Sequence, residues 1–183
     1  RDPRWVAVVL LIAIEATVFG LMVFTYFYTR GRLQVWPPTS PGPRELRFGA
    51  AVLVALLLSA FTTHLINREL YGARLLNARR LLVATTVLSL VALGLRAVEL
   101  SHLPFRWDSN VFGSIFWGLL CLHTMHLIAG NFENLLFLVL LYRGPIEKKH
   151  LVDLEVNGVY WYFVVFSWLP LYAILYLDGA LPW

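Results

Sequence analysis

The sequence predicts an all-helical integral membrane protein with five transmembrane spans. Of the 183 residues, 59% are hydrophobic and only 14% are charged, whereas soluble domains average roughly 45–50% and about 25%. The apolar residues form five long blocks separated by short polar stretches, as a hydrocarbon solvent requires. These blocks do not alternate apolar with polar residues, which argues against a barrel. Aromatic residues gather near the block ends, where Trp and Tyr favour the membrane interface.

Each block is long enough, or nearly so, to cross the hydrocarbon layer, which takes about 20 helical residues. The fourth block is the longest, so we expect it to tilt or to project from the bilayer. We find no internal repeat and no soluble domain, and therefore expect a single transmembrane bundle over residues 1–183. In chain order, the predicted spans are 5–28, 48–66, 81–100, 112–142 and 156–177.

Loop charges give the bundle an orientation, because cytoplasmic loops carry an excess of Lys and Arg. One side holds the nine basic residues Arg1, Arg4, Arg68, Arg74, Arg79, Arg80, Arg143, Lys148 and Lys149, and the other holds the five residues Arg30, Arg32, Arg44, Arg47 and Arg106. This difference predicts that the N-terminus lies inside and the C-terminus outside. We interpret the net charge of +4 as a topology signal and expect no nucleic-acid partner.

The segment 35–47, between the first two spans, reads VWPPTSPGPRELR. Its four prolines and one glycine forbid a regular helix and stiffen the backbone. We expect a fixed cap that lies against a partner or the membrane surface.

Glu15 lies near the middle of the first span, with apolar residues on both sides. An ionisable group at that depth is costly unless it is paired or hydrated, so it marks a functional site by default. Two interpretations remain open. Glu15 is either a proton-linked or lipid-contacting carboxyl, or a neutral acid that is hydrogen-bonded to a neighbouring helix.

Arg96 and Glu99 are three residues apart in the third span, so they share one helix face. One interpretation is an ion pair within the helix, near its outer end. The other is an inward-facing pair that binds a lipid headgroup or a residue of another helix.

His123 and His126 are also three residues apart, in the fourth span, and His64 could join them. Two ligands are too few for zinc, and axial haem ligands normally come from different helices, so we expect no metal on this chain. Helix packing or lipid-headgroup contacts are the favoured roles of these histidines. Cys121 lies inside an apolar block, and no nucleophile or phosphate-binding motif accompanies it. The sequence therefore predicts no catalytic residue.

The stretch 112–130 reads FGSIFWGLLCLHTMHLIAG, and it resembles the signature of the cytochrome c oxidase subunit III family of the haem–copper oxidases. In that signature an aromatic residue precedes Gly-Ser, a phenylalanine follows, and a His-x-x-His step leads to a glycine. The matching residues here are Phe112, Gly113, Ser114, Phe116, His123, His126 and Gly130.

Further matches follow in the family's order and cover nearly the whole chain. Residues 155–168 read EVNGVYWYFVVFSW and resemble the family's final-helix signature, which includes Trp161 and Trp168. The other matches are the intramembrane Glu15 with Phe19, Phe24 and Phe27, the external-loop motif Trp36-Pro37-Pro38, and Glu99 at the end of the 96–99 stretch.

Two departures from the family pattern lie in the last span. Tyr162 stands where the family usually has histidine, and Val165 where it usually has aspartate, so any lipid or partner contact of those polar groups is in question here. The chain also has five predicted spans rather than seven, and it resembles the shorter family form that lacks the first two helices. That form begins inside and ends outside, in agreement with the loop charges.

The resemblance implies a subunit without a redox centre in a proton-pumping terminal oxidase that passes electrons from cytochrome c to O2. Haem and copper are expected on subunits I and II, and further respiratory-complex subunits are possible partners. Subunit I is the expected main contact, and small residues of the second span would face it. These are Ala50, Ala51, Ala55, Ser59 and Ala60. Bound phospholipid and support of proton uptake are expected, with Glu15, Arg96, Glu99, His123 and His126 as the proton-linked or lipid-contacting residues.

Three alternatives remain. The electron donor could be a quinol, although Trp36-Pro37-Pro38 favours the cytochrome c branch. The chain could be an independent small transporter, but no inverted repeat or pair of broken helices supports this. It could also be a small b-haem membrane anchor. We expect the membrane to be the bacterial plasma membrane, with the mitochondrial inner membrane as the alternative.

Overall fold

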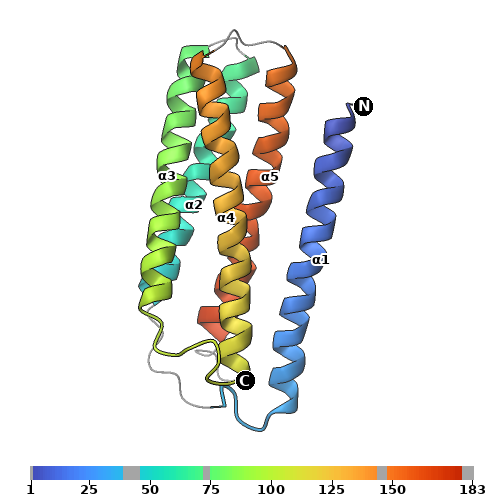
Figure 1. The fold of residues 1–183 in the computed structure, drawn as a ribbon, viewed down its shortest axis with the longest axis vertical. Coiled ribbons are helices and arrows are strands. Elements are labelled where there is room, and N and C mark those ends of the chain that lie inside the picture. The colour runs from blue at the N-terminus through green and yellow to red at the C-terminus, as the bar shows by residue number, and fades with distance from the viewer. Residues whose placement is uncertain (1, 39–45, 72–74, 144–147, 179–183) are drawn as a thin grey trace.

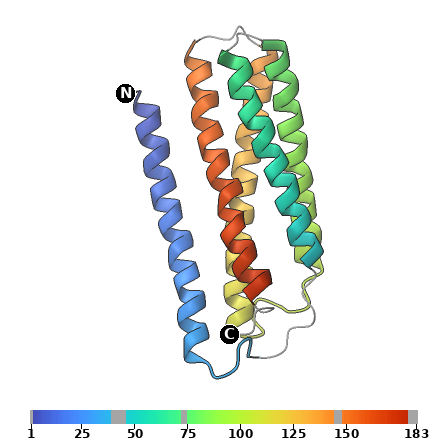
Figure 2. The same cartoon turned by 180° about the vertical axis from the view of Figure 1, so that it is seen from behind.

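The computed structural model describes residues 2–38, 46–71, 75–143 and 148–178, and within these it contains helices and no strands. All five long helices are long and apolar enough to span a membrane, which confirms the predicted fold class. They run up and down along one axis (Figures 1 and 2). In chain order they are α1 (Pro3–Arg32), α2 (Leu46–Tyr71), α3 (Leu75–Ser101), α4 (Val111–Arg143) and α5 (Lys148–Tyr172), and α5 continues into the π-helical turn η1 (Ala173–Leu177).

Helices α2 to α5 form a closed group, and α1 stands at its edge beside α4 and α5 (Figures 1 and 2). We call the end of the bundle with Asp2 the N-terminal end and the end with Asp178 the C-terminal end. In both views α1 approaches the other helices at the C-terminal end and diverges from them at the N-terminal end. Only 11% of its most apolar window is buried.

The helices extend beyond the predicted spans. The third starts at Leu75 and the fifth at Lys148, each several residues before the first apolar residue of its block. The spans were defined by apolar residues, whereas a helix continues as long as its backbone hydrogen bonds do. At the start of α1, Pro3 needs no N–H partner, and the Asp2 carboxylate accepts a hydrogen bond from the Arg4 backbone N–H at 3.0 Å.

The end of α5 departs from α-helical geometry. Pro170 lies inside α5, where it lacks a backbone donor and disturbs the regular hydrogen-bond ladder. Three residues later the helix widens into η1. This turn places Tyr176 in the core, with 4% of its surface exposed.

Large aromatic residues of α5 fill the centre of the bundle. Trp161 is buried, and its indole N–H donates to the Ser59 hydroxyl of α2 at 3.0 Å. Its ring lies against Gly130 of α4, where an added Cβ would come within 2.7 Å of two ring carbons. The family-signature glycine and tryptophan are therefore two halves of one contact between α4 and α5.

The small residues of the second span are not a partner-facing surface, which corrects the expectation from the sequence. Ala55, Ser59 and Ala60 are buried within the chain itself. A small residue allows two helices to approach closely whichever helix arrives, so composition alone does not identify the neighbour. Here the neighbour includes Trp161 of α5.

We predict that Gly130→Ala lowers the free energy of unfolding by about 1–3 kcal/mol, the usual cost of overpacking a core, because Trp161 must move. Gly94→Ala is the matched control, since an added Cβ at Gly94 meets nothing within 4 Å. Denaturant unfolding in detergent measures both variants. An equal response of the two would show that the Gly130–Trp161 contact does not limit packing.

Candidate functional site

A fully buried ion pair lies in α3. The Arg96 Nη1 and Glu99 Oε2 atoms are 2.6 Å apart, and the side chains are 0% and 3% exposed. The two residues are about one helical turn apart, as their sequence spacing predicts. Both proposed interpretations hold in part, because the pair forms within the helix and also faces other helices.

Three further residues complete this cluster, which we call the arginine cluster. The Tyr176 hydroxyl of η1 donates to Glu99 Oε1. The Arg96 guanidinium lies 3.7 Å from the ring centroid of Trp168 in α5, close enough for a cation–π interaction. Its Nη2 atom is 3.5 Å from His123 Nδ1 in α4. The cluster therefore joins α3, α4, α5 and η1.

The contacts of His123 indicate its tautomer. Its Nε2 atom lies 3.0 Å from the Val164 carbonyl oxygen, which can only accept, so the ring hydrogen is on Nε2. Nδ1 is then an acceptor that faces the Arg96 guanidinium. This neutral ring accepts from the cation without adding a second positive charge to a buried site.

A second polar cluster, which we call the glutamate cluster, connects α1 to α4 and α5. Glu15 Oε2 is 3.5 Å from His126 Nε2, and the Tyr160 hydroxyl donates to Glu15 Oε1 at 3.4 Å. The His126 Nδ1 atom faces the Leu122 carbonyl oxygen at 2.6 Å and donates to it. A single proton can therefore lie between Glu15 and His126, on the carboxyl or on the imidazole.

The two histidines of the His-x-x-His step thus belong to different clusters. His123 contacts Arg96, and His126 contacts Glu15. Within the described residues, no group of three or more His, Cys, Asp or Glu side chains is placed to hold a metal ion. His64, the third candidate ligand, is exposed on α2.

A cavity of about 880 Å³ lies between α1, α4 and α5 towards the N-terminal end. Its walls are mostly aliphatic side chains, while Arg4, Arg143 and Asp153 line it at that end. Deeper along the helices, Glu133 and Tyr160 also line it. Because Tyr160 contacts Glu15 as well, the cavity leads to the glutamate cluster.

An ion pair joins α1 and α5 at the N-terminal end of the cavity. Arg4 Nη1 lies 2.6 Å from Asp153 Oδ1, and Arg4 Nη2 lies 2.7 Å from Asp2 Oδ2. The hydrogen bonds from the Arg4 side chain and backbone lower the pKa of Asp2 to about 2. Asp2 therefore stays ionised at neutral pH and remains a partner for Arg4.

Comparison with known proteins identifies the family. The model of the family described as cytochrome c oxidase subunit III matches residues 5–180. The chain belongs to the cytochrome c oxidase subunit III family. It is 29% identical to cytochrome c oxidase subunit 3 of Triticum aestivum over 80% of this chain and 56% of that protein. The corresponding values for the Synechocystis sp. protein of the same name are 26%, 96% and 76%. For the Yarrowia lipolytica protein they are 30%, 80% and 55%. The chain thus spans little more than half the length of the wheat and yeast relatives.

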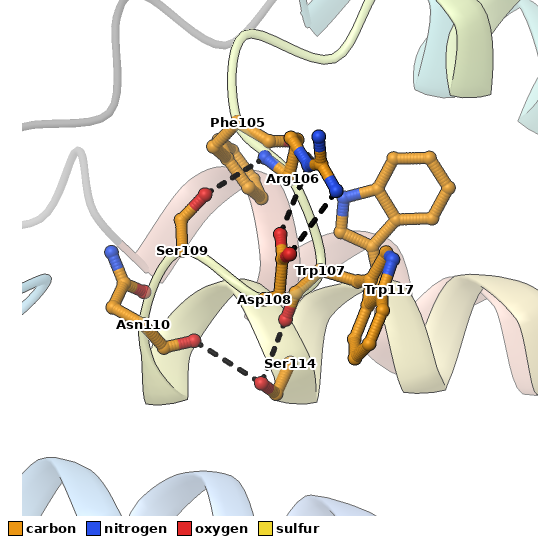
Figure 3. Close-up of polar contacts among 8 residues, drawn as sticks. All are labelled: Phe105, Arg106, Trp107, Asp108, Ser109, Asn110, Ser114 and Trp117. Atoms are coloured by element: carbon orange, nitrogen blue, oxygen red, sulfur yellow. Dashed lines mark hydrogen bonds and ion pairs between the residues drawn. The ribbon is translucent and has the colours of Figure 1, made fainter.

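The Gly-Ser step of the subunit III signature has a structural explanation (Figure 3). A Cβ at Gly113 would lie 2.7 Å from the Arg106 carbonyl oxygen, so glycine lets the preceding loop approach α4. The Gly113 backbone N–H donates to the Asn110 side chain at 2.8 Å, and the Ser114 hydroxyl donates to the Trp107 carbonyl at 2.8 Å. Both signature residues fix the loop between α3 and α4.

The external-loop motif of subunit III is anchored through its tryptophan. The Trp36 indole N–H donates to the Tyr26 hydroxyl at 3.2 Å, and its ring packs edge-on against Phe112. Pro37 and Pro38 follow in a bent segment. The remainder of the expected cap, 39–45, lies outside the described residues.

The two departures in the last span have different environments. Val165 is fully buried, so apolar packing occupies the position where subunit III usually has aspartate. Tyr162 is half-buried and stacks on Phe166 at 6.1 Å between centroids. Nothing here assigns either residue a lipid contact.

Several residues of these sites were missed from the sequence. Tyr160 and Tyr176 belong to an aromatic-rich span in which interfacial aromatics are expected, and Asp153 and Asp178 were interpreted as loop or helix-end residues. A usable signal existed for Tyr160, because it lies in the last span at a depth where an aromatic hydroxyl needs a partner. The functional roles of Glu15, Arg96, Glu99, His123 and His126 remain predictions.

We predict that Arg96→Gln and Glu99→Gln each cost about 3–5 kcal/mol of stability, because each leaves the other charge buried and unpaired. The double variant should cost much less than the sum of the two. A double-mutant cycle in detergent measures this coupling. Arg106→Gln and Asp108→Asn form a matched control on an exposed pair (78% and 44% exposed), where coupling stays below about 1 kcal/mol. Additive losses at Arg96 and Glu99 would contradict the prediction.

Proposed function

We propose that this chain is subunit III of a proton-pumping haem–copper terminal oxidase that receives electrons from cytochrome c. Its match to the subunit III family over residues 5–180 carries the proposal. The names of its relatives, cytochrome c oxidase subunit 3, support cytochrome c rather than quinol as the donor. Haem and copper would reside on subunits I and II, and this chain would pack against subunit I in a bacterial plasma membrane.

The cavity supports a role in lipid binding. Aliphatic walls suit acyl chains, and a rim that carries Arg4, Arg143 and Asp153 suits a phospholipid headgroup. In the membrane, basic residues at helix ends are placed to meet headgroup phosphates. A lipid there would fill the space between α1 and the other helices and hold α1 in place.

The glutamate cluster supports a role in proton uptake. Glu15 and His126 share one site for a proton, and Tyr160 connects them to the cavity. Groups of this kind can accept a proton from a hydrated cavity and release it again. We propose that they help subunit I to take up protons and to sustain turnover.

Removal of this chain from the purified oxidase tests the assignment of roles. We expect oxygen consumption of the depleted complex to start near the intact rate and then to decay faster during turnover. The haem content of the partner, measured by absorbance, and re-addition of the chain are the controls. Loss of all activity at the first turnover, with haem content unchanged, would mean that this chain carries part of the chemistry.

Ala7→Trp tests the lipid site. The bulky side chain projects from a lining position and should displace bound phospholipid, which quantitative mass spectrometry of the purified complex detects. Ala13→Trp is the matched control, because Ala13 is exposed on the same helix and does not line the cavity. The expected result is fewer retained phospholipids in Ala7→Trp alone. Equal retention in the two variants would argue against this cavity as the site.

A further inference from the structure

Helix α1 is fastened at the C-terminal end of the bundle. The Tyr26 side chain is buried, and its hydroxyl donates to Asp178 Oδ2 at 2.8 Å. Arg30 forms an ion pair with the same carboxylate, and Trp36 packs edge-on against Tyr26 at 5.3 Å between centroids. These contacts join several groups from both ends of the chain, so α1 has a fixed point there.

At the N-terminal end the cavity separates α1 from α4 and α5, and the Arg4–Asp153 ion pair bridges it at 2.6 Å. The two side chains remain 39% and 32% exposed. Ion pairs that water can reach contribute little and open readily. The two ends of α1 are therefore held with unequal strength.

Arg4 has a second anionic partner on its own helix. Its Nη2 and Nε atoms contact the two carboxylate oxygens of Asp2 at 2.7 and 3.0 Å. When the bridge to Asp153 opens, this bidentate contact remains, so the open form leaves no unpaired arginine at the membrane surface. The bridge can thus open at low cost without unfolding the start of α1.

We propose that the Arg4–Asp153 ion pair is a latch that closes the lipid cavity and sets the rate at which a phospholipid enters and leaves it. The latch rests on the proposed lipid-binding function. When it opens, α1 tilts about its fastened C-terminal end and the cavity becomes continuous with the bilayer. When it closes, the headgroup is held between α1, α4 and α5.

Lipid release from the intact complex tests the latch. The complex is loaded with deuterium-labelled phosphatidylglycerol, placed in nanodiscs of unlabelled phosphatidylcholine, and sampled over time by mass spectrometry. We expect Asp153→Asn and Arg4→Gln each to release the labelled lipid roughly 1.5- to 5-fold faster than the wild type, as the strength of an exposed pair implies. The exchanged pair Arg4→Asp with Asp153→Arg should return the rate towards that of the wild type.

Asp2→Asn is the matched control. It removes the other carboxylate next to Arg4 while keeping a residue that caps helices well, so the release rate should stay near that of the wild type. Circular dichroism of each variant complex verifies that the helices are intact. If the exchanged pair does not assemble, the two single substitutions decide the matter.

The outcomes separate the latch from the lipid site. A wild-type complex that holds no labelled lipid would refute both the lipid site and the latch. Retained lipid with unchanged release in Asp153→Asn would refute the latch and leave the lipid site standing. Faster release in Arg4→Gln with slower release in Asp153→Asn would show that Arg4 binds the headgroup directly, which also overturns the latch.

Discussion

The ion pair between Arg96 and Glu99 persists inside an apolar bundle because neighbouring helices supply partners for both charges. Trp168, His123 and Tyr176 surround it, so neither group meets lipid. A charge in hydrocarbon is costly, and this cost ties the positions of α3, α4 and α5 to one another. Displacement of any one of these helices would leave a charge or a hydroxyl without its partner.

The same constraint acts on a smaller scale at other helix contacts. A polar pair crosses each of four interfaces in the group α2 to α5, where the unfavourable alternative is an unsatisfied group in lipid. The pairs are Thr62–Thr85, Ser89–Asn131, Asn134–Asn157 and Ser59–Trp161. Helix α1 is different, because its polar contacts in mid-membrane are made by one residue, Glu15. This difference explains why the cavity lies beside α1 and not elsewhere in the described helices.

The sequence allowed the five spans to be predicted because each is a long apolar run, and it allowed the Arg96–Glu99 pair to be predicted because helical spacing brings them together. It could not reveal the other members of each cluster. Tyr176 reaches Glu99 from a turn whose widening follows Pro170, and helical periodicity assumes that no such change occurs. The small residues of α2 were assigned to a partner because composition shows that a close approach is possible without showing which helix makes it.

The π-turn at the end of α5 makes the length of the chain there as important as its composition. A π-turn accommodates about one residue more per turn than an α-turn. Removal of a single residue between Ala173 and Leu177 would let the chain continue as a regular α-helix. The segment beyond would then be rotated by about 100° and shifted by about 1.5 Å. Tyr176 would leave Glu99, and Asp178 would leave Tyr26 and Arg30. Related proteins that keep both contacts should therefore tolerate exchanges of side chain in this turn more readily than insertions or deletions.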